Sequence, residues 1–172
     1  FNIKAQGEYK KLRWQGGRVE HPLVYLPVFP GTNCDYDTAK AFRKAGAEVR
    51  PDVFCNLREE DVRESIGRMV TAIAECQTLA LSGGFSEGDE PDGSGKFIAS
   101  VLSNAEVSAA IDGLLQRGGL ILGICNGFQA LVKSGLLPYG KTGTLPRESP
   151  TLFMNDINRH ISQIACTRLA TI

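Results

Sequence analysis

The chain has 172 residues, 42% of them hydrophobic and 22% charged, which is ordinary for a globular domain with a core of its own. Lys plus Arg and Asp plus Glu each number 19, and the resulting formal net charge of zero argues against nucleic acid or a membrane surface as the main partner. No apolar run approaches the roughly 20 residues that span a bilayer, and five cysteines without a CxxC pair argue against a metal site or disulfide framework and favour a reducing, cytoplasmic environment.

Strand-like apolar runs and helix-like periods alternate along the chain. Residues 1–22 are polar and show no clear period, so we expect a linker or leader arm there and one folded domain over 23–172. After that arm the pattern predicts strands over 23–29, 49–54, 78–84 and 120–125, and helices over 37–49, 58–76, 96–119 (in two pieces) and 127–137.

This alternation predicts an α/β fold in three layers, with a mostly parallel central sheet between helices. Ligands of such folds bind beyond the carboxyl ends of the strands. Three glycine-containing turns follow predicted strands and should therefore face one crevice. They are Pro30-Gly31-Thr32-Asn33, Ser82-Gly83-Gly84-Phe85 and Gly123-Ile124-Cys125-Asn126-Gly127.

The last of these turns has the form G-x-C-x-G between a predicted strand and a predicted helix. Such a sharp turn exposes its central side chain above the sheet and requires small neighbours. Partial positive charge at the start of the helix favours a thiolate, and backbone N–H groups there can hold an oxyanion. The pattern indicates that Cys125 is a nucleophile; the alternative is a buried structural cysteine at a strand end.

The segment "LGICNGFQALVKSGLLP" resembles the nucleophile turn of class I, triad-type glutamine amidotransferases. More narrowly, it is similar to the glutaminase domain of phosphoribosylformylglycinamidine synthases. Three further segments carry the same resemblance in order and spacing: "VFPGTNCDYDTAKAFRKAGAEV", "LSGGFSEGDEPDGSGKF" and "SPTLFMNDINRH". The resemblance implies the flavodoxin-like amidotransferase fold. In the family's stand-alone glutaminase subunits the first strand lies at the very N-terminus, whereas 22 residues precede it here. In this respect the chain resembles the long single-chain form of the synthase, in which the glutaminase is the C-terminal domain.

The resemblance implies that Cys125 attacks the side-chain amide of glutamine, giving a glutamyl thioester and ammonia. The backbone N–H of Asn126 and one from the Gly84-Phe85 turn would hold the oxyanion, and Gln129, one helical turn on, would help bind glutamine. Phe85 and Ser86 would line the same pocket, and Asn155 and Arg159 fall in a segment that resembles a substrate-side loop. Ammonia would pass to a synthetase domain of the same parent chain, which uses ATP and magnesium to convert formylglycinamide ribonucleotide to formylglycinamidine ribonucleotide; this chain itself is expected to hold no cofactor.

One departure concerns the histidine and glutamate that the family places well downstream of the cysteine. His21 precedes the first predicted strand, and His160 has no Glu after it up to Ile172, so neither matches. We expect His160 to be a surface or strand residue. The resemblance also implies that the last strands of the sheet and the catalytic His and Glu lie outside these residues, so that turnover is not expected from this chain alone.

Two alternative functions remain at this point. One is another cysteine hydrolase of the same fold, such as a PfpI-like enzyme, although that group usually places His directly after the cysteine, where Asn126 stands here. The other is a non-catalytic packing module. The segment 88–96 fails the register of a phosphate-binding loop and is expected to be a surface loop. Cys34 follows a glycine turn and could lie near the crevice, although a structural role is expected for it. Cys55, Cys76 and Cys166 are expected to be packing residues.

Overall fold

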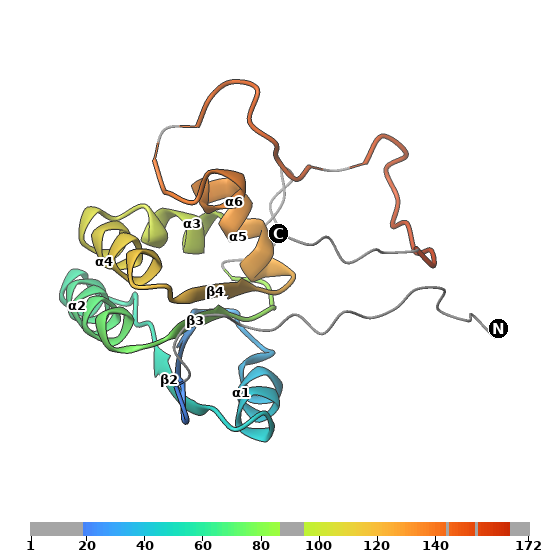
Figure 1. The fold of residues 1–172 in the computed structure, drawn as a ribbon. Helices are drawn as coiled ribbons and strands as arrows, with labels where there is room; N and C mark the ends of the chain where they lie inside the picture. The colour runs from blue at the N-terminus through green and yellow to red at the C-terminus, as the bar shows by residue number, and fades with distance from the viewer. Residues whose placement is uncertain (1–18, 87–94, 144, 154, 166–172) are drawn as a thin grey trace.

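The computed structural model describes residues 19–86, 95–143, 145–153 and 155–165 (Figure 1). In chain order the strands are β1 (Leu23–Val28), β2 (Glu48–Val53), β3 (Thr78–Leu81) and β4 (Leu120–Gly123). The helices are α1 (Asp35–Lys44), α2 (Glu59–Glu75), α3 (Lys96–Leu102), α4 (Ala105–Gln116), α5 (Asn126–Ser134) and α6 (Leu136–Tyr139). The predicted alternation of strands and helices is therefore confirmed.

The four strands form one sheet in the order β2-β1-β3-β4, and every neighbouring pair is parallel. This is the order of a flavodoxin-like sheet. Because all four strands are parallel, the turns that follow β1, β3 and β4 leave the sheet at the same end, where the strands have their carboxyl ends. The register pairs Leu81 at the end of β3 with Gly123 at the end of β4, so these two turns start side by side.

Alternate residues of the central strands face two separate cores, as a two-residue strand period requires. Val24, Leu26 and Ala80 pack with residues of α1 on one face. Tyr25, Leu79 and Leu81 pack on the other face, in a larger cluster to which α2, α3, α4 and α5 all contribute. Figure 1 shows α1 on one side of the sheet and α2 and α4 on the other. The three-layer fold is confirmed.

The outer strand β4 is covered less well than the central strands. Leu122 pairs with Ala80, whose side chain lies in the α1 core, so Leu122 also faces that side. Leu120 and Leu122 are 54% and 40% exposed, because α1 packs against β1 and β2 and does not extend over β4.

The segment after α6 has no helix or strand among its described residues. Its large apolar side chains are exposed, among them Phe153, Ile157, Ile161 and Ile164. No single helix in the described ranges is long and apolar enough to cross a membrane; α3 and α4 satisfy that test only as a pair, and the pair is bent by 77°.

Candidate functional site

Cys125 occupies a strained turn between β4 and α5. Ile124 stays tied to the sheet, since its N–H donates to the Leu81 carbonyl at 3.0 Å, and the next residue turns away sharply. Cys125 has φ 51° and ψ −108°, a backbone conformation that a residue with a Cβ rarely adopts. Helix α5 begins at the following residue, and the Cys125 side chain is exposed. The predicted sharp turn is therefore present, and the alternative of a buried cysteine is wrong.

Packing explains the two glycines of the G-x-C-x-G pattern. A Cβ on Gly127 would lie 2.2 Å from the Leu81 carbonyl oxygen, so the first turn of α5 can approach β3 only without a side chain there. A Cβ on Gly123 would lie 2.6 Å from Cδ1 of Leu131 and 2.8 Å from the backbone of Gly127. The glycines thus let strand and helix meet closely enough to hold Cys125 at the tip.

The three predicted turns do meet at one edge of the sheet. Thr32 and Gly84 form an isolated antiparallel bridge between the first two turns. Gly84 has φ 137°, and a Cβ on it would lie 2.7 Å from the Gly31 carbonyl oxygen. A Cβ on Gly83 would lie 3.4 Å from Cβ of Cys125, which places the second turn against the third.

A chain of side-chain hydrogen bonds connects the second turn to α5. The Ser86 hydroxyl donates to Oδ1 of Asn126 at 2.7 Å, and Nδ2 of Asn126 donates to Oε1 of Gln129 at 3.3 Å. Ser86 and Asn126 are buried, at 3% and 1% exposure, whereas Gln129 is half-buried. Because a buried bond of this kind fixes both partners, the side chain of Gln129 is held by the same residues that pack beneath Cys125.

The structure narrows which N–H group of the Gly84-Phe85 turn could hold an oxyanion. The Phe85 N–H donates to the Gly31 carbonyl at 2.9 Å and is therefore used within the loop pair. The donor left to consider in this turn is the Gly84 N–H. The Phe85 ring is 57% exposed, so it lies at the rim of the crevice and not in its floor.

The downstream candidates lie in a separate turn. Nδ2 of Asn155 donates to the Arg159 carbonyl at 2.7 Å, and Oδ1 of Asn155 accepts from the Ile157 N–H at 3.1 Å. These contacts hold the turn to itself, and both predicted residues are exposed. Asn155 and Arg159 are thus not joined to the Cys125 turn by any contact that the structure records among the described residues.

The two histidines lie outside the Cys125 turn. His160 is exposed and belongs to no strand, so the surface alternative for it is confirmed and the strand alternative is wrong. His21 precedes β1 and so lies at the amino edge of the sheet, opposite the edge that carries Cys125.

The remaining cysteines divide into different classes. Cys76 is buried, as expected of a packing residue, and burial raises the pKa of its thiol. Cys55 is exposed, so the packing role expected for it is wrong. Cys34 is exposed beside Gly83, with its Sγ 3.6 Å from the point where a Cβ on that glycine would lie. This is the alternative position expected from the glycine turn before Cys34, and the structural role preferred for it does not fit an exposed side chain. Cys166, residues 1–18 of the leader arm and residues 88–94 of the 88–96 loop lie outside the described residues.

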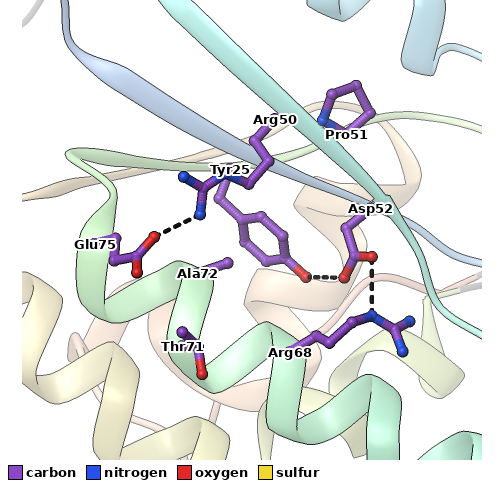
Figure 2. A pocket seen from close by; sticks show the side chains of 8 residues that line it. All are labelled: Tyr25, Arg50, Pro51, Asp52, Arg68, Thr71, Ala72 and Glu75. Atoms are coloured by element: carbon purple, nitrogen blue, oxygen red, sulfur yellow. Dashed lines mark hydrogen bonds and ion pairs between the residues drawn. The ribbon is translucent and has the colours of Figure 1, made fainter.

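A pocket of about 330 Å³ lies elsewhere, between β2 and α2 (Figure 2). Strand β2 is the sheet edge opposite β4. The charged side chains that line this pocket form ion pairs with one another. Arg50 pairs with Glu75 at 2.5 Å, and Arg68 pairs with Asp52 at 3.2 Å.

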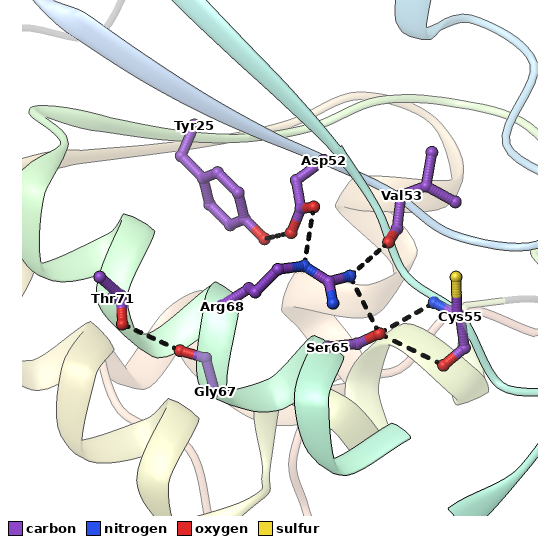
Figure 3. Close-up of polar contacts among 8 residues, drawn as sticks. All are labelled: Tyr25, Asp52, Val53, Cys55, Ser65, Gly67, Arg68 and Thr71. Carbon is purple, nitrogen blue, oxygen red and sulfur yellow. Dashed lines mark hydrogen bonds and ion pairs between the residues drawn. The ribbon is translucent and has the colours of Figure 1, made fainter. Parts of the chain in front are cut away.

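Arg68 is the centre of a polar network beneath that pocket (Figure 3). Its guanidinium donates to Asp52, to the Val53 carbonyl at 2.9 Å and to the Ser65 hydroxyl at 3.2 Å. The Tyr25 hydroxyl donates to the other Asp52 oxygen at 3.2 Å. Burial, followed by the charge of Asp52, raises the pKa of Tyr25 strongly. These mutual contacts join α2 to β2, and we assign the network a structural role.

Comparisons with known proteins agree with the Cys125 turn. Residues 21–171 match the sequence profile of the CobB/CobQ-like glutamine amidotransferase domain. The chain is 41% identical over 109 residues to phosphoribosylformylglycinamidine synthase subunit PurQ of Dehalococcoides mccartyi, covering 63% of this chain and 38% of that protein. It is 36% identical over 128 residues to the subunit of the same name from Cereibacter sphaeroides, covering 74% of this chain and 47% of that protein.

Among solved structures, PurLQS from Thermotoga maritima is similar with a TM-score of 0.46 and 29% identity, covering 68% of this chain and 46% of that one. The chain spans less than half the length of these relatives. The family profile, in contrast, extends over nearly all of the chain from β1 onward. The chain therefore belongs to the CobB/CobQ-like glutamine amidotransferase domain family.

Proposed function

We propose that the chain is a glutaminase component of a phosphoribosylformylglycinamidine synthase, with Cys125 as its nucleophile. The observation that carries the proposal is the strained, exposed Cys125 at the start of α5, with Gln129 fixed one helical turn away through Asn126. The names of the relatives, phosphoribosylformylglycinamidine synthase subunits PurQ, support the choice of substrate and pathway.

In this proposal the Cys125 sulfur attacks the side-chain amide carbon of glutamine. The carbon–nitrogen bond of the resulting tetrahedral species then breaks, ammonia leaves, and a glutamyl thioester remains on Cys125. The negative charge on the amide oxygen would be held by the Asn126 N–H, at the start of α5, and by the Gly84 N–H. We assign the second position to Gly84 and not Phe85, because the Phe85 N–H is donated to Gly31.

Glutamine would be oriented by the side chain of Gln129. Its Oε1 accepts from Asn126, and Asn126 is in turn fixed by Ser86, so the amide of Gln129 has a defined orientation. Ser86 and the Asn126 side chain are then positioning residues, since they act on glutamine through Gln129. Turnover also needs a general acid and base at the sulfur. The structure records no contact of His21 or His160 with the Cys125 turn, so we assign that role to no residue in the described part of the chain.

The ammonia would be used by a synthetase component that consumes ATP with magnesium and converts formylglycinamide ribonucleotide to formylglycinamidine ribonucleotide. The name of the solved relative PurLQS supports a partnership between a PurQ-like chain and a second component. We propose no ATP or magnesium site on the described residues of this chain.

The test is covalent labelling with 6-diazo-5-oxo-norleucine, a glutamine-shaped electrophile, followed by intact mass and peptide mapping. We expect one adduct, on Cys125, and competition by added glutamine. Cys125→Ala should remove the adduct, and Cys55→Ala, which removes an exposed thiol outside the crevice, should leave it unchanged. Labelling spread over several cysteines, or a single adduct that glutamine does not suppress, would contradict a glutamine site at this turn.

A further inference from the structure

Two thiols lie at the crevice on either side of a glycine. A Cβ on Gly83 would lie 3.4 Å from Cβ of Cys125 and 3.6 Å from Sγ of Cys34. The two cysteines follow β4 and β1, which are not neighbours, and Gly83 follows the strand between them. Because Gly83 has no side chain, no Cβ occupies the point that both cysteines approach, where the Ile124 carbonyl oxygen is the third neighbour at 3.6 Å.

The backbones of both cysteines are held in place. The Cys34 carbonyl accepts from the Thr38 N–H at 3.1 Å and from the Thr38 hydroxyl at 2.7 Å. The Cys125 carbonyl accepts from the Gln129 N–H at 2.9 Å. The side chains are exposed, so each sulfur can rotate about χ1 without unpacking a core, and the Cys34 thiol would give up its 3.2 Å hydrogen bond to Asn33 Oδ1. Since the Gly83 point lies 3.4 Å from Cβ of Cys125 and 3.6 Å from Sγ of Cys34, these two atoms are at most 7.0 Å apart. A disulfide needs Cβ atoms about 3.5–4.5 Å apart, so the two turns must close the remaining gap when the bond forms.

We propose that Cys34 and Cys125 form a reversible disulfide beside Gly83 when the protein is oxidised by a peroxide. The Cys125 sulfur attacks one peroxide oxygen, the oxygen–oxygen bond breaks, and Cys125 becomes a sulfenic acid while hydroxide leaves. The Cys34 sulfur then attacks the sulfenic sulfur, the sulfur–oxygen bond breaks, and water leaves with the Cys34 proton. In total two thiols lose two hydrogens and the peroxide is reduced to water.

The disulfide would have two effects on Cys125. It stops oxidation before the irreversible sulfinic and sulfonic acids, because the sulfenic acid is consumed by Cys34. It also removes the sulfur from any reaction until a small thiol reduces the bond by exchange. The second effect, as a control of glutamine hydrolysis, rests on the proposed function, whereas the bond itself does not.

The sequence makes the bond easy to identify. Trypsin cleaves after Lys and Arg, so Cys34 falls in peptide 19–40 and Cys125 in peptide 118–133, each with a single cysteine. The full chain would be treated with hydrogen peroxide, alkylated and digested without reduction. We expect a linked pair of these two peptides, lighter than their sum by two hydrogens, which dithiothreitol separates.

Three variants sharpen the test, each checked for folding by circular dichroism. Cys34→Ser should abolish the linked pair and increase sulfinic acid on Cys125 several-fold. Gly83→Ala should slow linkage several-fold, since its methyl group fits at ordinary contact distances but occupies the space between the two side chains. Cys55→Ser, which removes an exposed thiol elsewhere, should leave the linkage unchanged.

Two results would overturn the proposal. One is oxidation of Cys125 to sulfinic acid at the same rate in the parent chain and in Cys34→Ser, with no linked pair. The other is linkage of Cys34 to Cys55 as readily as to Cys125. Failure of 6-diazo-5-oxo-norleucine to label Cys125 would contradict the glutaminase proposal and not this one, because the linked peptides report the thiol pair alone.

Discussion

At the scale of single residues, glycine decides how the Cys125 turn is built. Because residue 127 is glycine, α5 can approach the Leu81 carbonyl at the end of β3. Because residue 84 is glycine, the turn after β3 can approach the turn that follows β1. The G-x-C-x-G spacing predicted a tight turn, and that part of the site could be predicted from sequence because the constraint is local. The hydrogen bond from Ser86 to Asn126 could not be predicted from sequence. It joins residues 40 apart in the chain and depends on how the second turn folds over α5.

Two helical glycines offer a matched test of this packing. Gly127→Ala places a methyl group 2.2 Å from the Leu81 carbonyl oxygen, so the backbone must shift. We expect the free energy of unfolding to fall by about 1–3 kcal/mol. Gly67→Ala lies in α2 with nothing within 4 Å of the new Cβ, and it should raise that free energy by about 0.5–1 kcal/mol. Urea denaturation measures both, and equal effects of the two substitutions would refute the packing argument.

At the scale of elements, the predicted strands are right in order, and their errors lie at the ends. The third strand was expected to reach 84 and ends at Leu81, and the fourth was expected to reach 125 and ends at Gly123. In both cases the chain leaves the sheet and forms a turn of the candidate site. The periodicity of apolar residues does not predict where that turn begins. The helix expected over 37–49 ends at Lys44, because Gly46 has φ 94° and β2 already starts at Glu48.

The break between α3 and α4 depends on one cap. Asn104 Oδ1 accepts from the N–H groups of Glu106 and Val107, at 3.0 and 3.3 Å, and so satisfies two donors at the start of α4. Asn104→Ala should lower the free energy of unfolding by about 1 kcal/mol, and Asn104→Asp, which keeps the acceptor, should lose much less. Thermal and urea unfolding report the difference; if the alanine and aspartate variants are equally stable, the cap does not stabilise the helix.

At the scale of the whole molecule, the two outer strands β2 and β4 differ in how their side chains are covered. At β2 the Tyr25, Asp52 and Arg68 network joins the strand to α2, whereas β4 exposes Leu120 and Leu122 on the α1 side. The crevice with Cys125 forms where turns from β1, β3 and β4 leave the sheet together. The position of the site is thus a property of strand order, and the parallel sheet predicted from the alternation of elements was enough to anticipate it.

The buried Tyr25 predicts how stability responds to alkaline pH. Its pKa in the folded chain lies above the ordinary value near 10, so above that pH the unfolded chain loses a proton that the folded chain keeps. The native state then binds more protons, and stability falls as pH rises, by up to about 1.4 kcal/mol per pH unit from this group. Below the ordinary pKa the contribution is constant.

Urea unfolding of the parent chain and Tyr25→Phe at several pH values between neutrality and about pH 11 tests this. The parent chain should lose stability more steeply than Tyr25→Phe once tyrosine begins to titrate. The pKa of Cys76 is also raised by burial and acts in the same direction, but it is present in both proteins and cancels in the comparison. Parallel stability curves for the two proteins would show that Tyr25 keeps its ordinary pKa in the folded chain.

The sequence by itself determined the fold class, the order of the strands and helices, and the Cys125 turn. These are set by apolar periodicity and by glycine spacing, and both are local properties of the chain. Only the tertiary structure showed that Cys34 and Cys125 both lie beside Gly83 and that Cys55 is exposed. It also showed that the Phe85 N–H donates to the Gly31 carbonyl in the neighbouring turn. The physical reason is that these contacts join turns from different strands, and their distances depend on how the strands pack in the sheet and not on separation along the chain.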